Sequence, residues 1–146
     1  MATDSVLAAR RPFVGVWTLE SFTEKTGSSE EVNPLGIAPL GFLIYTAEGF
    51  VSAQLMRRDR KALGPDPWDV GGVNLTKEYI AYCESYVIHE DRGEVIHVPK
   101  VSLLPNLINQ DQHRSFTFAH DTLTLITRRE HQSGAAIESR LIWRRC

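Results

Sequence analysis

The chain consists mainly of short runs in which apolar and polar residues alternate, separated by turn residues. Alternation with a period of two is typical of strands that bury one face. Short turn segments at Ala47–Gly49, Asp91–Gly93 and His120–Asp121 predict three hairpins. The runs predict eight strands: Val14–Thr23, Gly41–Thr46, Phe50–Met56, Glu84–Glu90, Glu94–Val98, Gln112–Ala119, Thr122–Arg129 and Ala135–Arg145.

Helical signals are confined to two short segments. Asp4 is a suitable N-cap for a turn over Ser5–Ala9, and Thr76 is a suitable N-cap for Lys77–Tyr82. The segment Arg57–Asn74 is rich in Gly, Pro and Asp and is too long for a hairpin turn. Loops of this length are often lids or binding loops, so Trp68 and Tyr79 either cover the barrel mouth as lid aromatics or pack the loop onto the barrel.

Eight strands in hairpin order predict an all-β fold, an up-and-down antiparallel barrel with short helical segments, as a single domain over residues 1–146. Closure removes exposed sheet edges, and eight strands leave an interior wide enough for side chains or one small ligand. A two-sheet sandwich is the alternative. The lack of an evident Greek-key crossover favours the barrel.

Composition and charge narrow the possible partners. The 146 residues are 42% hydrophobic and 23% charged, with a net charge of -2, which is typical of a folded protein. Neither half of the chain is basic, so we expect no nucleic-acid partner and no membrane partner. No apolar run is long enough to span a bilayer, and no secretory signal is evident, so we expect a cytoplasmic protein with Cys83 and Cys146 as free thiols.

A short helical turn precedes Gly15-Val16-Trp17, which resembles the G-x-W motif of lipocalins and related calycin barrels. The whole chain is similar to the small bacterial and fungal lipocalin-like domain family, with matching segments in order along nearly its entire length. Those segments are Gly15–Phe22, Gly41–Gly49, Ser52–Met56, Tyr82-Cys83 with Tyr86, Val95 with His97, Ser102–Asn106, Gln112 with Arg114 and Phe116, and Arg140–Trp143.

The resemblance implies a barrel whose lumen takes a small hydrophobic molecule. Some relatives act on polyketide-like compounds in natural-product pathways. The family has no single reaction, so the fold transfers to this chain more readily than the function does.

Two polar residues stand among the apolar positions of the predicted strands. Arg114 shares one strand face with Gln112 and Phe116, so an inward Phe116 brings the guanidinium inward too. Arg114 then contacts a ligand oxygen, or else it lies at the barrel mouth or pairs with Glu84 or Glu138. His97 falls on a strand whose two faces are both apolar, so it faces either the lumen, as an acid or base, or the surface.

Further polar and aromatic residues are candidates for ligand binding. The first hairpin admits two registers. In one, Tyr45 pairs with Ser52 and Leu43 with Gln54; in the other, Tyr45 shares its face with Val51 and Ala53. The predicted binding set is Tyr45, Gln54, Tyr86, Asn106, Gln112, Phe116 and Trp68.

Other features are expected to be structural. Trp17 is predicted to close one end of the barrel, stacked on Arg140 or Arg144. The five histidines have no metal-ligand spacing, and no phosphate-binding, zinc-protease or nucleophile-elbow motif occurs, so we expect neither a metal nor a cofactor.

The leading hypothesis is an enzyme that isomerises, cyclises or dehydrates a small oxygen-bearing molecule without a cofactor. His97 would move the proton, and Arg114 would hold a carbonyl or enolate oxygen. The alternative is a non-catalytic carrier or sensor that uses the same lumen. The partners expected are this small hydrophobic molecule and, as an option, a second copy of the chain in a homodimer.

Overall fold

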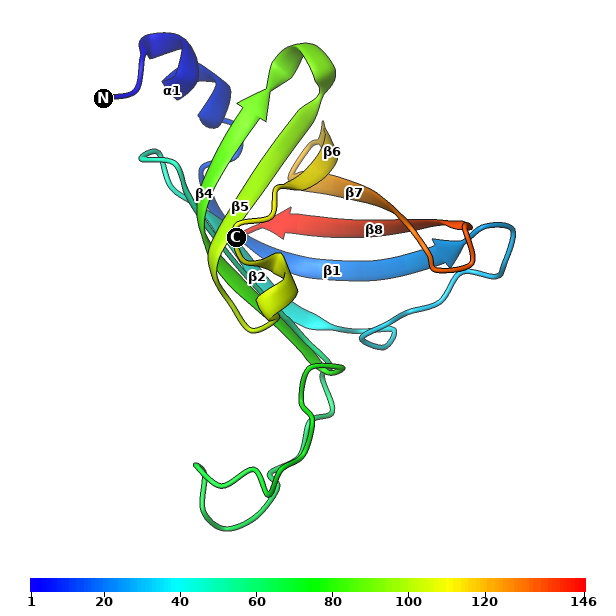
Figure 1. The fold of residues 1–146 in the computed structure, drawn as a ribbon. Coiled ribbons are helices and arrows are strands. Elements are labelled where there is room, and N and C mark those ends of the chain that lie inside the picture. Colours follow the sequence, from blue (N-terminus) through cyan, green and yellow to red (C-terminus); the bar gives the residue numbers. More distant parts are fainter.

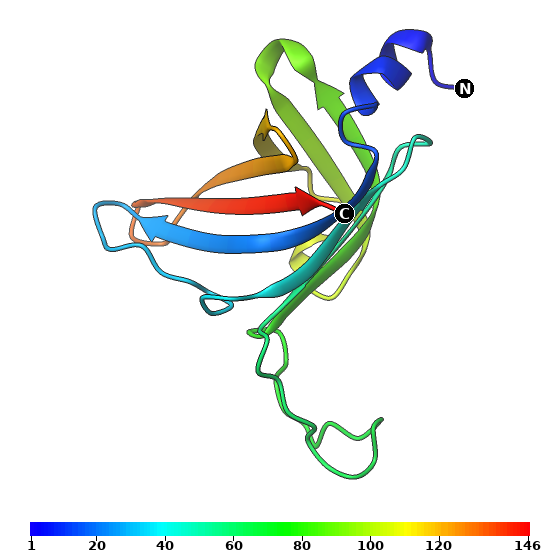
Figure 2. The ribbon, with the colours of Figure 1, turned by 180° about the vertical axis from the view of Figure 1, so that it is seen from behind.

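The eight strands form one closed barrel in which each strand pairs antiparallel with the next and β8 pairs with β1. The computed structural model describes residues 1–146, and Figures 1 and 2 show the barrel from opposite sides. The barrel prediction is therefore confirmed, and the sandwich alternative is wrong. The elements are α1 (Asp4–Arg10), β1 (Gly15–Thr26), β2 (Leu40–Tyr45), β3 (Phe50–Met56), β4 (Tyr79–His89), β5 (Glu94–Ser102), β6 (Gln112–Ala119), β7 (Thr122–Glu130), β8 (Ala136–Arg145) and the short 3-10 turns Glu90–Arg92 and Pro105–Leu107.

The predicted helix over Lys77–Tyr82 is wrong, because this segment supplies the start of β4. Tyr79 pairs with Met56 and Ala81 pairs with Gln54, so ladder hydrogen bonds to β3 replace those of a helix. The short helix before β1 is confirmed, but its N-cap is Thr3, whose side chain accepts from the backbone N–H of Val6.

The first hairpin adopts the register in which Tyr45 pairs with Val51 and Leu43 with Ala53. All four side chains are buried in the core. Because successive residues of a strand point to opposite faces, Gln54 lies on the outer face of β3, where its side-chain oxygen accepts from the Tyr79 hydroxyl at 3.4 Å. The register that would have turned Gln54 inward is wrong.

Trp17 closes one end of the barrel. Its indole N–H donates to the backbone oxygen of Phe13 at 2.8 Å, and the Arg145 guanidinium lies 4.1 Å from the ring centre. Arg145 therefore takes the role predicted for Arg140 or Arg144. Those two arginines point to the outer face, where they pair with Glu138 and Glu20.

The long connection between β3 and β4 extends away from the barrel in both views (Figures 1 and 2). Trp68 is 92% exposed there and covers nothing, so the lid expected from this segment is not formed. Its backbone is held mainly by local turns, such as the bond from the Trp68 N–H to the Asp66 carboxylate at 2.9 Å.

Two further structural facts concern the helices and the cysteines. No helix combines the length and the apolar character needed to cross a membrane. Cys83 and Cys146 are both free thiols, as predicted.

Gly41 of β2 lies close to the backbone of β3 and to Leu19 of β1. A Cβ at this position would lie 2.8 Å from the backbone oxygen of Gln54 and 3.2 Å from Cβ of Leu19. We expect Gly41→Ala to lower the free energy of unfolding by about 1–3 kcal/mol, because backbone must shift to admit the methyl group. Urea unfolding measures the change. Gly64→Ala is the control, since nothing lies within 4 Å of its Cβ, and equal stability of the two variants would contradict the prediction.

Candidate functional site

A cavity of about 120 Å³ lies inside the barrel. Apolar side chains form most of its wall, and polar groups of Tyr82, His97 and Arg114 enter it from β4, β5 and β6. No carboxylate lines it. The lining residues are Phe22, Leu43, Ala53, Leu55, Ile80, Tyr82, His97, Arg114, Leu125, Thr127, Ser139, Leu141 and Trp143.

The side chain of His97 is fully buried and points into the barrel, one of the two directions that the sequence left open. Its Nε2 lies 2.6 Å from the Tyr45 hydroxyl, and its Nδ1 lies 2.7 Å from the Tyr82 hydroxyl. Both ring nitrogens are therefore occupied by phenols that come from two other strands.

The number of available protons determines which group donates in each hydrogen bond among Tyr45, His97 and Tyr82. A neutral imidazole carries one N–H, and each phenol carries one O–H, so two hydrogen bonds leave one hydroxyl proton free. Tyr45 is 1% exposed and its hydroxyl has no other partner, whereas Tyr82 borders the cavity. Buried donors are normally satisfied, so we assign Tyr45 as donor to Nε2 and His97 Nδ1–H as donor to Tyr82. The Tyr82 proton is then free to point into the cavity.

Burial determines the protonation states of these groups. It lowers the pKa of His97 well below its usual 6.5, and the nearby Arg114 cation lowers it further. Burial also raises the pKa of Tyr45 and of Tyr82, and Arg114 opposes that rise in both. At neutral pH the network therefore consists of a neutral imidazole and two neutral phenols beside one cation.

Arg114 brings that cation to the cavity wall. Its guanidinium carbon lies 5.6 Å from the ring centre of Tyr82, and its Nη1 donates to the backbone oxygen of Gln112 at 2.7 Å. Neither Glu84 nor Glu138 pairs with it, because these bind Lys100 and the exposed Arg128. A half-buried guanidinium without a carboxylate keeps donors available for an oxygen of a bound molecule.

The alternation predicted for β6 is confirmed, with Gln112, Arg114 and Phe116 on the inner face. Gln112 lies beside the network through its pairing with His97, and its backbone oxygen holds Arg114. Phe116 is part of an aromatic cluster at the closed end, 4.9 Å from the ring of Phe13. Gln112 and Phe116 therefore lie inside the barrel next to the cavity, without lining it.

The remaining predicted binding residues lie away from the cavity. Tyr86 is buried opposite His97 on the inner face, but its hydroxyl donates to the backbone oxygen of Thr46 at 2.7 Å. Gln54 lies on the outer face of β3, and Trp68 lies on the extended loop. Asn106 is exposed in the 3-10 turn after β5. Inward direction in a barrel is decided by register and bulges, which residue type alone does not reveal.

Sequence reasoning missed Tyr82 and Trp143. Tyr82 was assigned to a helix, although the stretch Tyr79–His89 contains the β-branched and aromatic residues typical of a strand. The sequence indicates Trp143 only through the segment Arg140–Trp143 of the family resemblance. The alternation of Ile137, Ser139, Leu141 and Trp143 on the last strand was the available signal for its inward direction.

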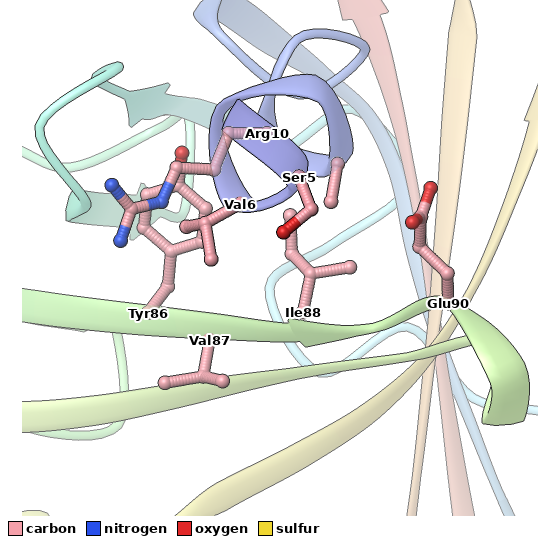
Figure 3. A pocket seen from close by; sticks show the side chains of 8 residues that line it. Ser5, Val6, Arg10, Tyr86, Val87, Ile88 and Glu90 are labelled. Atoms are coloured by element: carbon pink, nitrogen blue, oxygen red, sulfur yellow. The ribbon is translucent and has the colours of Figure 1, made fainter. Parts of the chain in front are cut away.

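A second hollow lies outside the barrel, between α1 and β4. Figure 3 shows Val6 and Arg10 of the helix facing Tyr86 and Ile88 of the strand. The Arg10 guanidinium lies 5.4 Å from the ring centre of Tyr86 and donates to the backbone oxygen of Ala47 at 2.9 Å. These contacts anchor α1 against the wall that backs Tyr45, whose ring centre is 4.8 Å from that of Tyr86.

Comparison with known proteins gives one match. A family model described as a lipocalin-like domain matches residues 14–146, which include all eight strands. No curated protein and no solved structure matches the chain.

Proposed function

Because the chain belongs to the family of lipocalin-like domains, we propose that its barrel cavity binds a small, mainly apolar molecule through one oxygen atom. The carrying observation is the pair of donors at the cavity wall, the Tyr82 hydroxyl and the Arg114 guanidinium, in a lining that is mainly apolar. Pockets of this kind bind by apolar contact and orient their ligand through a few polar groups. A carbonyl or enolate oxygen fits two converging donors.

The same donors suit enolisation, the step that cofactor-free isomerisation, cyclisation and dehydration of ketones share. Tyr82 gives its hydroxyl proton to the carbonyl oxygen, and its phenolate then takes a proton from the neighbouring carbon. A C–H bond breaks, an O–H bond forms, and Tyr82 is restored. His97 Nδ1–H and Arg114 stabilise the transient phenolate, and the product of the step is the enol.

In this proposal the proton-moving role passes from His97 to Tyr82. Both nitrogens of His97 are occupied by phenols, so its contribution is to hold Tyr82 in position and to supply the N–H behind it. Arg114 keeps the role of binding the oxygen. Resemblance and composition further lead us to place this chemistry in the cytoplasm, in the assembly of polyketide-like natural products. A homodimer stays a prediction.

A non-catalytic carrier is the second candidate, and one observation favours it. No carboxylate lines the cavity, and burial raises the pKa of Tyr82, so a strong base is missing until Tyr82 has given up its proton. A carrier needs only the apolar wall and the anchoring donors. Native mass spectrometry of the purified protein would identify a molecule retained in either case.

Deuterium exchange distinguishes the two functions. With cyclohexanone in D2O as probe, we expect the protein to accelerate exchange of the hydrogens next to the carbonyl. Tyr82→Phe should lower that acceleration at least about 10-fold, since general acid–base catalysis commonly contributes 10²–10⁴-fold. Proton NMR follows the exchange.

Tyr79→Phe is the matched control, because that hydroxyl bonds to Gln54 on the outer face. It should exchange deuterium at the wild-type rate. Binding of the ketone without any acceleration by the wild type would support the carrier and reject the enzyme.

A further inference from the structure

Trp143 carries a buried hydrogen-bond donor that has no acceptor. Its side chain is 1% exposed and lines the barrel cavity, and its Nε1 finds no partner in the protein. It is the one buried side-chain nitrogen or oxygen of which this is true. By contrast, the indole N–H of Trp17 donates to the Phe13 backbone oxygen at 2.8 Å.

An orphan donor in an apolar cavity is unusual in a folded protein. Leaving a buried donor unsatisfied destabilises the fold by about 1–3 kcal/mol, so native structures rarely retain one without a use for it. Phenylalanine would fill most of that space without that cost. The indole at this position therefore points to an acceptor from outside the chain, which reaches Nε1 when the side chains around it shift, since the nitrogen has under 1 Å² of accessible surface.

Trp143 and Arg114 lie at different depths of the same cavity. On the inner face, Trp143 pairs with Leu123, and Leu123 pairs with Phe118 on β6. Arg114 precedes Phe118 by four residues, which is about 13 Å along a strand. Both side chains nevertheless line the same cavity. A ligand held by Arg114 and Tyr82 thus has its far end near the indole layer.

We infer that the ligand carries a second oxygen, at the end opposite its first, which accepts a hydrogen bond from Trp143 Nε1–H. This inference rests on the proposed function and names its ligand class, compact single-ring molecules with two opposed oxygens, such as diketones, hydroxyketones or quinones. The cavity of about 120 Å³ is close in size to the roughly 150 Å³ apolar cavity that accommodates benzene, so a six-membered ring is the appropriate size.

Two probes of the same ring size test the inference. Cyclohexane-1,4-dione has both oxygens, and cyclohexanone has only the first. The measured quantity is the ratio of their dissociation constants, determined by NMR titration of the wild type and of Trp143→Phe. We expect Trp143→Phe to reduce the preference for the dione over cyclohexanone about 5-fold, as for loss of one neutral hydrogen bond.

The indole resonance of the wild type gives an independent measurement that needs no variant. The dione, and not cyclohexanone, should shift the Trp143 Nε1–H signal downfield. An equal ratio in the two proteins together with an unmoved indole signal would overturn the inference, and would indicate that Trp143 has a structural role or binds only water. If neither ketone binds the wild type, the proposed function fails and the inference fails with it. If both ketones bind through Arg114, the proposed function stands and the comparison tests the inference alone.

Discussion

Replacement of His97 by leucine is expected to lower the free energy of unfolding by about 2–5 kcal/mol at pH 7.5. Leucine fills similar space but leaves the hydroxyls of Tyr45 and Tyr82 without their partner, and each unsatisfied buried group costs about 1–3 kcal/mol. Urea unfolding followed by fluorescence measures the loss. The effect is large for a single polar residue because one ring satisfies two buried hydroxyls.

A triple variant is the control for this interpretation. Removing the polar atoms of a hydrogen-bonded set together is nearly neutral, whereas removing one member is not. His97→Leu combined with Tyr45→Phe and Tyr82→Phe should therefore recover most of the lost stability. A triple variant as unstable as the single one would show that the cost comes from packing and that the hydrogen bonds contribute little.

The same residue should make stability depend on pH. The pKa of His97 is lowered in the folded protein and ordinary, near 6.5, in the unfolded chain, so below that pH the unfolded chain binds the extra proton. The stabilisation is present above pH 6.5 and is lost as the pH falls towards the folded pKa, by about 1.4 kcal/mol per pH unit once the unfolded histidine is protonated.

Urea unfolding between pH 7.5 and pH 5 tests this dependence. The difference in stability between the wild type and His97→Leu should shrink as the pH falls below 6.5. The imidazole contacts Tyr45 and Tyr82, whose pKa values burial raises above 10, so neither phenol loses its proton in this range, and the charged Arg114 lies nearby. A constant difference across the range would mean that His97 ionises in the folded barrel as readily as in the unfolded chain.

Replacement of Arg114 by glutamine is expected to weaken binding of cyclohexane-1,4-dione about 10- to 100-fold. Hydrogen bonds from charged donors are worth about 1.5–3 kcal/mol, and the apolar wall offers no other cation to replace this one. Ligand-observed NMR titration measures the change in dissociation constant. The same variant should also abolish most of the deuterium exchange, because the transient Tyr82 phenolate loses its charged partner.

Stability distinguishes a binding role of Arg114 from a structural one. Its guanidinium has no carboxylate partner, and its bond to Gln112 joins residues on the same strand, so Arg114→Gln should unfold at about the wild-type urea concentration. Arg128→Gln, which removes an exposed arginine paired with Glu138, should leave binding unchanged. A large loss of stability in Arg114→Gln with unchanged affinity would assign the residue to the fold instead.

Local patterns in the sequence determined most of the barrel. Phe50–Met56 and Gln112–Ala119 were predicted with the bounds that the structure has, because strict alternation on one strand depends on nothing distant. That alternation also placed Arg114 on the inner face with Phe116. The helix predicted over Lys77–Tyr82 was wrong because N-cap signals are local, and pairing with β3 outweighed them.

The site itself was decided by tertiary structure. Tyr45 and His97 are 52 residues apart, and Tyr82 and His97 are 15 apart, so their hydrogen bonds exist only after the register of β2 with β3 and of β4 with β5 is set. A one-residue slip in either register would turn a tyrosine outward. The sequence by itself therefore determined a barrel with an arginine facing inward, whereas long-range strand pairing decided which phenols meet the imidazole and left the Trp143 indole without a partner.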